Sequence, residues 1–390
     1  MSRPLQGITV VSLEQAIAAP FCTRQLADLG ARVIKIERPG GGDFARAYDT
    51  RVRGQSSHFV WTNRSKESLT LDLKHEAAGA LLRKLLAGAD VLVQNLAPGA
   101  AARLGLDYAS LSGDFPRLIV CDISGYGADG PYRDKKAYDL LVQSESGFVS
   151  VTGTPEEGVK AGASVADIAA GMYAYSNILA ALLERGQTGR GKRIDISMLE
   201  ATVEWMGFPL YYAFDGAAPP PRAGAAHATI YPYGPFPTGD GKTVMVGLQN
   251  EREWAAFCAT VLQDPDLASH PDYADNSRRS ANRDTLRARI VAVFSALDAD
   301  QVIARLEAAR IANARVNTMA DVWAHPQLAA RGRWREVETP AGAVPALLPP
   351  GATEARMDPV PAVGQQTDAI LAELGCTPED IHALHAAGAL

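Results

Sequence analysis

The sequence of 390 residues predicts an α/β protein in which a large parallel-sheet domain is followed by a smaller second domain. Two observations support this fold class. Up to about residue 200, short apolar runs alternate with helix-like segments, which is typical of strand–helix–strand units. Near residue 215 the chain becomes rich in proline and glycine, and mostly helical segments follow.

The first strand–helix–strand unit is expected over residues 7–36. Residues 7–13 form a short apolar run, and residues 32–36 form the next one. Between them, residues 20–30 have proline near the first turn and glycine at the end, as helices do. A right-handed parallel crossover is the default for such a unit. The pattern continues with expected strands at 68–73, 91–94 and 118–123 and a helix at 76–87.

The domain boundaries follow from changes in composition. Residues 1–215 are the first part of the large domain, and residues 216–240 are a crossover linker, too long for an ordinary connection. Residues 241–328 are a small α+β domain. Residues 329–390 return to strand-like and turn-like pieces, with a final amphipathic helix at about 366–374.

Composition excludes several classes of protein. A formal net charge of −6 argues against a nucleic-acid binder. The four cysteines are widely spread, without a CxxC or a His/Cys cluster, which predicts a reducing compartment and no metal site. We expect no signal peptide and no run of about 18 apolar residues that could span a membrane. The sequence therefore predicts a cytoplasmic protein.

Two aspartates are the candidate catalytic residues. Asp167 lies where a loop of small residues turns into a long apolar helix, so another molecule could come close to its carboxylate. That carboxylate can act as a nucleophile or only cap the helix. Asp139 precedes a helix-like run, and the residues alone favour a capping role for it. His227 is a lone histidine, and no GxSxG motif accompanies it.

Candidate binding residues follow the first two expected strands. Gln15, Ala16 and Ile17 come directly after the first strand, where open α/β sheets bind ligands. Arg38 and Arg46 flank the glycines at 40–42 after the second strand. Arginine suits phosphate because its planar fork donates two hydrogen bonds. Each feature alone is also typical of a plain surface turn; the further cations expected near this edge are Lys74 and Arg103.

Taken together, these segments resemble the family III coenzyme A transferases, the group that includes formyl-CoA transferase and carnitine-CoA transferase. The resemblance runs nearly end to end and is carried by NRSKESLTLDLK, VLVQNLAPGAAARLGL, KAYDLLVQSESG and VADIAAG, among others. It implies a Rossmann-like large domain and a small domain, joined by crossovers into a ring. Two such rings interlock as a homodimer, with 216–240 as one crossover and 329–390 completing the large domain.

The resemblance also implies the roles of individual residues. Asp167 corresponds to the family nucleophile, and Asp139 to a supporting acid. Ile17 replaces a glutamine of formyl-CoA transferase, which argues against an oxalate-like substrate, and AGAAH at 223–227 stands where that enzyme has a glycine-rich loop. The coenzyme A contacts correspond to Gln15, Ala16, Ile17, Arg38, Leu71, Lys74, Asn95, Leu96, Arg103 and Lys136.

The implied reaction moves coenzyme A from an acyl-CoA donor, with succinyl-CoA favoured, to a short carboxylic or dicarboxylic acid. It passes through an aspartyl anhydride and an aspartyl-CoA thioester, and coenzyme A is a substrate rather than a tightly bound cofactor. Backbone N–H groups at residues 15–17 are expected to stabilise the oxyanion. The candidates for binding a distal carboxylate are Arg222, His227, Tyr231 and Tyr233.

Two alternatives remain. The chain also resembles α-methylacyl-CoA racemases, in which a histidine precedes the second aspartate and acts as a base. Tyr138 stands in that place here, and a phenol with its ordinary pKa is a poor base at neutral pH. This substitution favours the transferase. The other alternative is a protein that binds coenzyme A without turnover.

Overall fold

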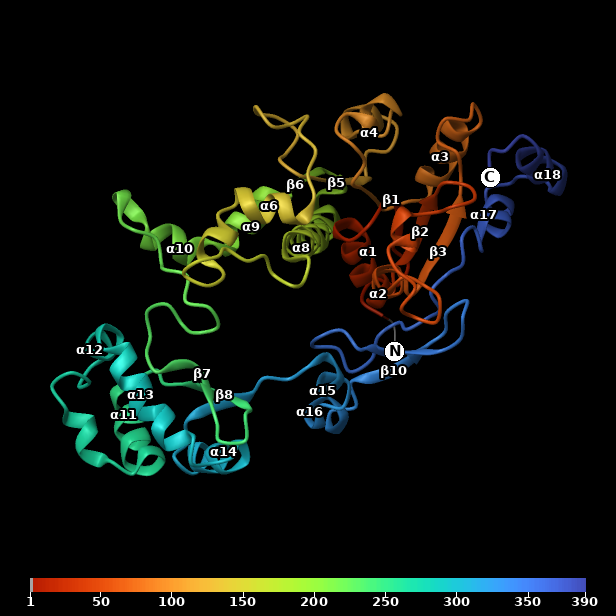
Figure 1. The fold of residues 1–390 in the computed structure, drawn as a ribbon. Coiled ribbons are helices and arrows are strands. Elements are labelled where there is room, and N and C mark those ends of the chain that lie inside the picture. The colour runs from red at the N-terminus through yellow and green to blue at the C-terminus, as the bar shows by residue number, and fades with distance from the viewer. Residues whose placement is uncertain (1–2) are drawn as a thin grey trace. The chain divides into compact units, whose positions relative to one another are not determined.

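The computed structural model describes residues 3–390 and divides the chain into two compact units (Figure 1). The large unit comprises the residues up to Phe148, Ala161–Gly207 and Leu328–Leu390, and the small unit comprises Val149–Lys160 and Phe208–Gln327. Residues 216–240, expected as a separate linker, lie inside the small unit.

The large unit is built on a six-stranded sheet in which every pair of neighbours is parallel. The strand order is β3-β2-β1-β4-β5-β6, the order of a doubly wound α/β sheet, and it reverses direction between β1 and β4. The prediction of an α/β protein with a large parallel sheet is thereby confirmed. The strands are β1 (Thr9–Leu13), β2 (Arg32–Glu37), β3 (Lys66–Thr70), β4 (Val91–Gln94), β5 (Ile119–Ser124) and β6 (Arg193–Ser197).

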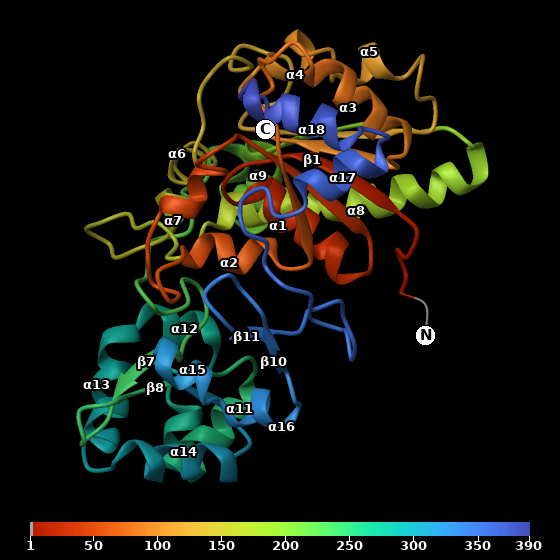
Figure 2. The ribbon, with the colours of Figure 1, turned by 90° about the vertical axis from the view of Figure 1, so that its right-hand side faces the viewer.

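Helices cover both faces of this sheet (Figure 2). One apolar core lies between the sheet and the pair α1 and α8, and a second lies between the opposite face and α3 with α17. The helices of the large unit are α1 (Ala18–Asp28), η1 (Phe44–Ala47), α2 (Ser57–Asn63), α3 (Ala78–Ala87), α4 (Ala100–Arg103), α5 (Tyr108–Leu111), α6 (Asp139–Glu145), α8 (Val165–Thr188), α9 (Met198–Trp205), α17 (Thr367–Glu373) and α18 (Pro378–Ala386); α7 (Phe148–Val151) crosses the unit boundary.

Helices α1 and α8 pack unusually closely near their N-terminal ends. A methyl group built on Gly171 of α8 would stand 2.7 Å from the carbonyl oxygen of Ala18 and 3.1 Å from the ring of Phe21. Both distances are shorter than van der Waals contact, so only glycine fits between the two backbones. Small buried residues on the same face of α8, such as Ala170 and Ala174, continue this contact.

Helix α8 corrects one expectation from the sequence. By length and composition it could cross a membrane, although no such segment was expected. Its buried face, however, is part of the core that it shares with α1 and the sheet, which is the usual position of a core helix in a globular domain.

The small unit has its own antiparallel sheet, ordered β7-β8-β9, and its own apolar core around Phe236, Trp254 and Phe294. Its elements are α10 (Gly207–Tyr212), η2 (Phe214–Gly216), β7 (Tyr233–Pro237), β8 (Thr243–Gly247), α11 (Glu251–Ala256), the π-helical η3 (Phe257–Leu262), η4 (Pro265–Ser269), α12 (Asn276–Ala281), α13 (Arg283–Phe294), α14 (Ala299–Ala308), β9 (Ala312–Arg315), α15 (Met319–Trp323) and α16 (Pro326–Ala330), of which α10 and α16 cross the unit boundary.

The C-terminal segment contains the hairpin β10 (Trp334–Val337) and β11 (Val344–Leu347), followed by two helices. The expectation that the helix at 366–374 is the last one is wrong, because α18 follows it. Helix α18 has a clear start signal: the Thr377 side chain accepts from the Asp380 N–H, the Asp380 side chain accepts in return, and Pro378 occupies the first turn.

Candidate active site

The predicted coenzyme A contacts gather at one edge of the large sheet. They lie on the segments that follow β1, β2, β3, β4 and β5, with Arg103 at the end of the short helix α4. Because these strands are parallel, their carboxyl ends meet at the same edge, which is where doubly wound sheets bind ligands. The residues brought to this edge are Gln15, Ala16, Ile17, Arg38, Leu71, Lys74, Asn95, Leu96, Arg103 and Lys136.

The centre of this edge is the point where the strand order reverses, between β1 and β4. Gln15 follows β1 and Asn95 follows β4, and the two residues are joined by a pair of hydrogen bonds. The Gln15 N–H donates to Asn95 Oδ1 at 2.9 Å, and Asn95 Nδ2 donates to the Gln15 carbonyl at 2.9 Å. The amide of Asn95 therefore fixes the backbone of the predicted binding turn.

Ala16, the next residue of the turn, has a left-handed backbone with φ of +62°. Its N–H donates to Asp43 Oδ1 at 3.2 Å. The expectation that the N–H groups of residues 15–17 stabilise an oxyanion is therefore wrong for Gln15 and Ala16, because both hydrogens already have acceptors. Ile17, which is buried and precedes α1, is the one whose N–H has no protein acceptor within residues 3–390.

Four exposed cations stand on these loops: Arg38, Lys74, Arg103 and Lys136. None of them forms an ion pair within the part of the chain that the structure describes, although Arg38 Nε donates to the Gly42 carbonyl at 2.9 Å. Their charges are therefore available to an anionic ligand. Arg46 differs, because it pairs with Glu37 at 2.7 Å and stacks over the Phe59 ring at 3.6 Å.

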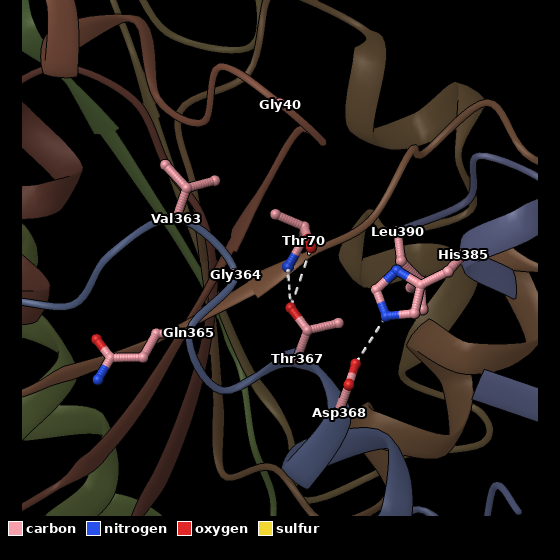
Figure 3. Close-up of a pocket in the computed structure, with 9 residues that line it drawn as sticks. All are labelled: Gly40, Thr70, Val363, Gly364, Gln365, Thr367, Asp368, His385 and Leu390. Carbon is pink, nitrogen blue, oxygen red and sulfur yellow. Dashed lines mark hydrogen bonds and ion pairs between the residues drawn. The ribbon is translucent and has the colours of Figure 1, made fainter. Parts of the chain in front are cut away.

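Two cavities open near this edge. One, of about 400 Å³, is lined by Gly40 and Thr70 together with the C-terminal residues Gly364, Asp368 and His385 (Figure 3). There the Thr70 N–H donates to Thr367 Oγ1 at 2.9 Å, and His385 Nε2 lies 2.8 Å from Asp368 Oδ1. The other cavity, of about 470 Å³, has Leu96, Gly99 and Asp122 among its lining residues at the ends of β4 and β5.

The Asp167 carboxylate lies in the first turn of α8 and is half-buried. It has no hydrogen-bond or ion-pair partner within residues 3–390, so its oxygens are free to react. Burial, and secondly the negative charge of Asp139, raise the pKa of Asp167 to about 7. At neutral pH a large fraction of the group is ionised, and its basicity is much higher than that of an ordinary aspartate.

Asp139, and not Asp167, accepts a hydrogen bond from a free N–H group at the start of α8. Although Asp139 is the first residue of α6, its Oδ1 accepts from the Ala166 N–H of α8 at 2.9 Å. Its Oδ2 accepts from Gln143 Nε2 at 2.6 Å. Since Asp139 satisfies the start of α8, the carboxylate of Asp167 is not needed as a cap. This arrangement favours the reactive role for Asp167 over the capping one.

Tyr48 lies near the Asp167 carboxylate, and the sequence analysis did not single it out. Burial raises the pKa of the Tyr48 phenol, and the negative charges of Asp43 and Asp167 add to the increase. Tyr48 is thus within electrostatic range of the Asp167 carboxylate, yet 48% of its surface is exposed. Its ring meets the His58 ring edge-on at 5.3 Å. The signal in the sequence is weak, because Tyr48 lies in an irregular loop.

The four predicted distal-carboxylate residues all belong to the small unit and have contacts inside it. Arg222 donates to the carbonyls of Thr154 and Pro155 at 2.7 and 2.8 Å. His227 accepts from the Ile230 N–H at 3.0 Å and stacks on Tyr233. The prediction for Tyr231 is corrected, because this side chain is buried in the small unit's core and no substrate reaches it there.

Comparison with known proteins identifies the family. The model of the family described as CoA-transferase family III matches residues 5–367. The chain belongs to the family III CoA-transferases. It is 35% identical over 384 residues to the succinate–glutarate CoA-transferase of Agrobacterium fabrum, covering 95% of this chain and 96% of the relative. It is 34% identical over 384 residues to the human succinyl-CoA:glutarate CoA-transferase, covering 95% and 86%.

The solved structures agree with this assignment. The crystal structure of a CAIB/BAIF family protein from Brucella suis superimposes with a TM-score of 0.84 at 34% identity, and the match covers 96% of this chain and 100% of that one. This family III CoA-transferase is therefore an enzyme of the transferase class, and coenzyme A thioesters are its substrates.

Proposed function

We propose that this family III CoA-transferase moves coenzyme A from a succinyl-CoA-type donor to a short dicarboxylic acid, with Asp167 as the covalent nucleophile. The observation that carries the proposal is the free, half-buried Asp167 carboxylate at the start of α8, which packs at Gly171 against the end of α1 that follows the binding turn. Burial, together with the negative charge of Asp139, raises the pKa of Asp167 to about 7, which makes its carboxylate a better nucleophile than an exposed one.

The reaction runs in four steps. In the first, an Asp167 oxygen attacks the thioester carbonyl and the C–S bond breaks. The coenzyme A thiolate departs, and a mixed anhydride of Asp167 and the donor acid is formed. The thiolate attacks the aspartyl carbonyl, which gives an aspartyl-CoA thioester and releases the donor acid. The acceptor carboxylate attacks this thioester and expels the thiolate. The thiolate then attacks the acceptor's acyl carbonyl and regenerates Asp167.

The surrounding residues support each requirement of this route. Arg38, Lys74, Arg103 and Lys136 provide charge for the phosphates of coenzyme A, and the 400 Å³ cavity beside Gly40 offers room for part of the nucleotide. Since the intermediates react with water, the site must be dry during turnover. The negative charge of Asp139 is, after burial, the second cause of the raised pKa of Asp167, and so helps to keep that carboxylate basic.

A panel of acids tests the substrate class. With succinyl-CoA as the donor, we expect glutarate and other short dicarboxylates to be converted at least tenfold more efficiently than monocarboxylates of equal length. The expectation follows from the two relatives that are glutarate CoA-transferases. It also follows from the usual free energy of a hydrogen bond between a charged side chain and a second carboxylate. The measurement is the appearance of each acyl-CoA by chromatography. Turnover of 2-methylacyl-CoA alone, with deuterium exchange at C2, would instead establish the racemase.

We also propose that the functional form is an interlocked homodimer. Supporting this, a run of large apolar side chains near the start of the small unit is exposed in the single chain, including Tyr211 at 81% and Phe214 at 73%. Exposed apolar patches of this kind mark protein–protein contacts.

Light scattering should give twice the chain mass of 41.4 kDa. Tagged and untagged dimers mixed under native conditions should not exchange subunits until they are unfolded and refolded together. A monomer in solution would contradict the dimer, and rapid native exchange would contradict the interlocking.

A further inference from the structure

Behind the predicted coenzyme A turn lies a group of four charged side chains that are at most 1% exposed: Glu14, Lys35, Asp43 and Lys66. Lys35 Nζ lies 2.7 Å from Asp43 Oδ2 and 3.4 Å from Glu14 Oε1. Lys66 Nζ lies 2.6 Å from the same Glu14 oxygen. Two acids and two lysines thus neutralise each other on the sheet face that α1 covers.

Such a network is not explained by stability alone. Removing four charges from water is costly, and well-packed apolar residues in place of buried ion pairs often leave a protein equally stable or more stable. Glu14, Lys35 and Lys66 come from, or directly follow, three neighbouring strands, β1, β2 and β3, where apolar residues would be the ordinary choice.

The group that Asp43 holds is the backbone of the binding turn. Its Oδ1 accepts from the Ala16 N–H at 3.2 Å and from the Ala45 N–H at 2.9 Å, while its Oδ2 is bound by Lys35. Ala16 has φ of +62°, a strained conformation for a residue with a Cβ, and it persists only where the surroundings enforce it. Asp43 connects this strained residue to a lysine fixed in the middle of β2.

We propose that Asp43 is a positioning residue: the carboxylate, anchored by Lys35, keeps Ala16 in its left-handed conformation and so shapes the turn before coenzyme A arrives. The inference rests on the proposed role of residues 15–17 in binding coenzyme A. Asp43 itself need not touch the ligand.

The test compares Asp43→Asn with a matched control, Asp28→Asn. Asp28 is also a buried aspartate in a buried ion-pair cluster, with Arg24 at 2.6 Å and Arg64 at 2.8 Å, but it lies at the opposite end of α1 from the turn. Both variants should lose thermal stability. Only Asp43→Asn should bind free coenzyme A about tenfold more weakly by calorimetry, since part of the bound conformation is no longer preformed.

A rescue experiment separates positioning from general damage. Glycine adopts positive φ without strain, so adding Ala16→Gly to Asp43→Asn should recover at least half of the lost binding free energy. The KM for the donor should recover with it. Equal loss of binding in the two aspartate variants, no loss in Asp43→Asn, or no recovery in the double variant would each overturn the proposal.

Should Asp43→Asn fail to fold, the pair Asp43→Leu with Lys35→Met removes the acceptor of the Ala16 N–H together with the buried lysine charge, and is expected to show the same tenfold loss of binding. Wild-type affinity in that folded pair would overturn the proposal. These outcomes can be distinguished from failure of the proposed function. If the wild-type protein did not bind coenzyme A, the proposed function would be contradicted. If the wild-type protein and the Asp43 variants bound coenzyme A equally well, only the positioning role would be refuted.

Discussion

Asp167→Asn is expected to lower turnover by at least a thousandfold, while the affinity for free coenzyme A stays within about threefold of wild type. The amide keeps the shape of the side chain but cannot form the anhydride. Initial rates with succinyl-CoA and glutarate give the first quantity, and calorimetry gives the second. Asp284→Asn is a suitable control, because Asp284 also lies in the first turn of a helix, α13, and should leave the rate unchanged.

The covalent route also predicts a trapped species. Hydroxylamine added during turnover should convert the aspartyl thioester of the wild-type enzyme into a hydroxamate at position 167, detected by peptide mass spectrometry. The Asp167→Asn protein should give no such peptide. An active asparagine variant, or an adduct on another residue, would remove Asp167 from its assigned role.

The rate of the enzyme should depend strongly on pH, because the pKa of Asp167 is raised to about 7. The nucleophile must be ionised, so kcat/KM for the donor should rise between pH 5.5 and 8 with an apparent pKa near 7. An unperturbed aspartate would give a flat profile over this range. In Asp139→Asn the midpoint should move to lower pH but remain above 4, since burial is the larger cause of the shift and Asp139 the smaller.

The same shift has a consequence for stability. A carboxyl group whose pKa is higher in the folded state than in the unfolded state destabilises the fold once the pH passes above both values. With an ordinary pKa of 3.8 and a folded pKa of about 7, the penalty is up to about 4 kcal/mol at pH 8 and disappears below pH 4. The free energy of unfolding of Asp167→Asn, measured with urea, should therefore be higher than that of the wild type at pH 8 and nearly equal to it at pH 4. Equal stability at pH 8 would contradict the raised pKa.

Much of the fold could be predicted from local patterns. The apolar run predicts the strand at 91–94 with its observed bounds, and Pro20 and Gly30 predict the first helix within two residues at each end. The third strand was misplaced by two to three residues. Its first residue, Lys66, is buried in an ion pair with Glu14. Because charged residues are usually exposed, the sequence pattern assigns such a residue to a loop and not to a buried strand.

The site could be predicted only in part. Parallel strand ends bring the predicted binding loops together, and family resemblance pointed to Asp167. The hydrogen-bond partners of Gln15 and Ala16 come from residues 80 and 27 positions away, so no local pattern reveals that these donors are occupied. The relation of Tyr48 to Asp167 is likewise tertiary.

The close contact at Gly171 couples the position of Asp167 on α8 to that of the binding turn before α1. Since no side chain separates α8 from α1 there, any residue larger than glycine would push the helix that carries Asp167 away from the helix that begins at the binding turn. On the proposed mechanism, we therefore expect the Asp167 carboxylate to keep one spacing from the turn at residues 15–17, whichever acid is carried. Differences in acyl length must then be accommodated elsewhere in the site.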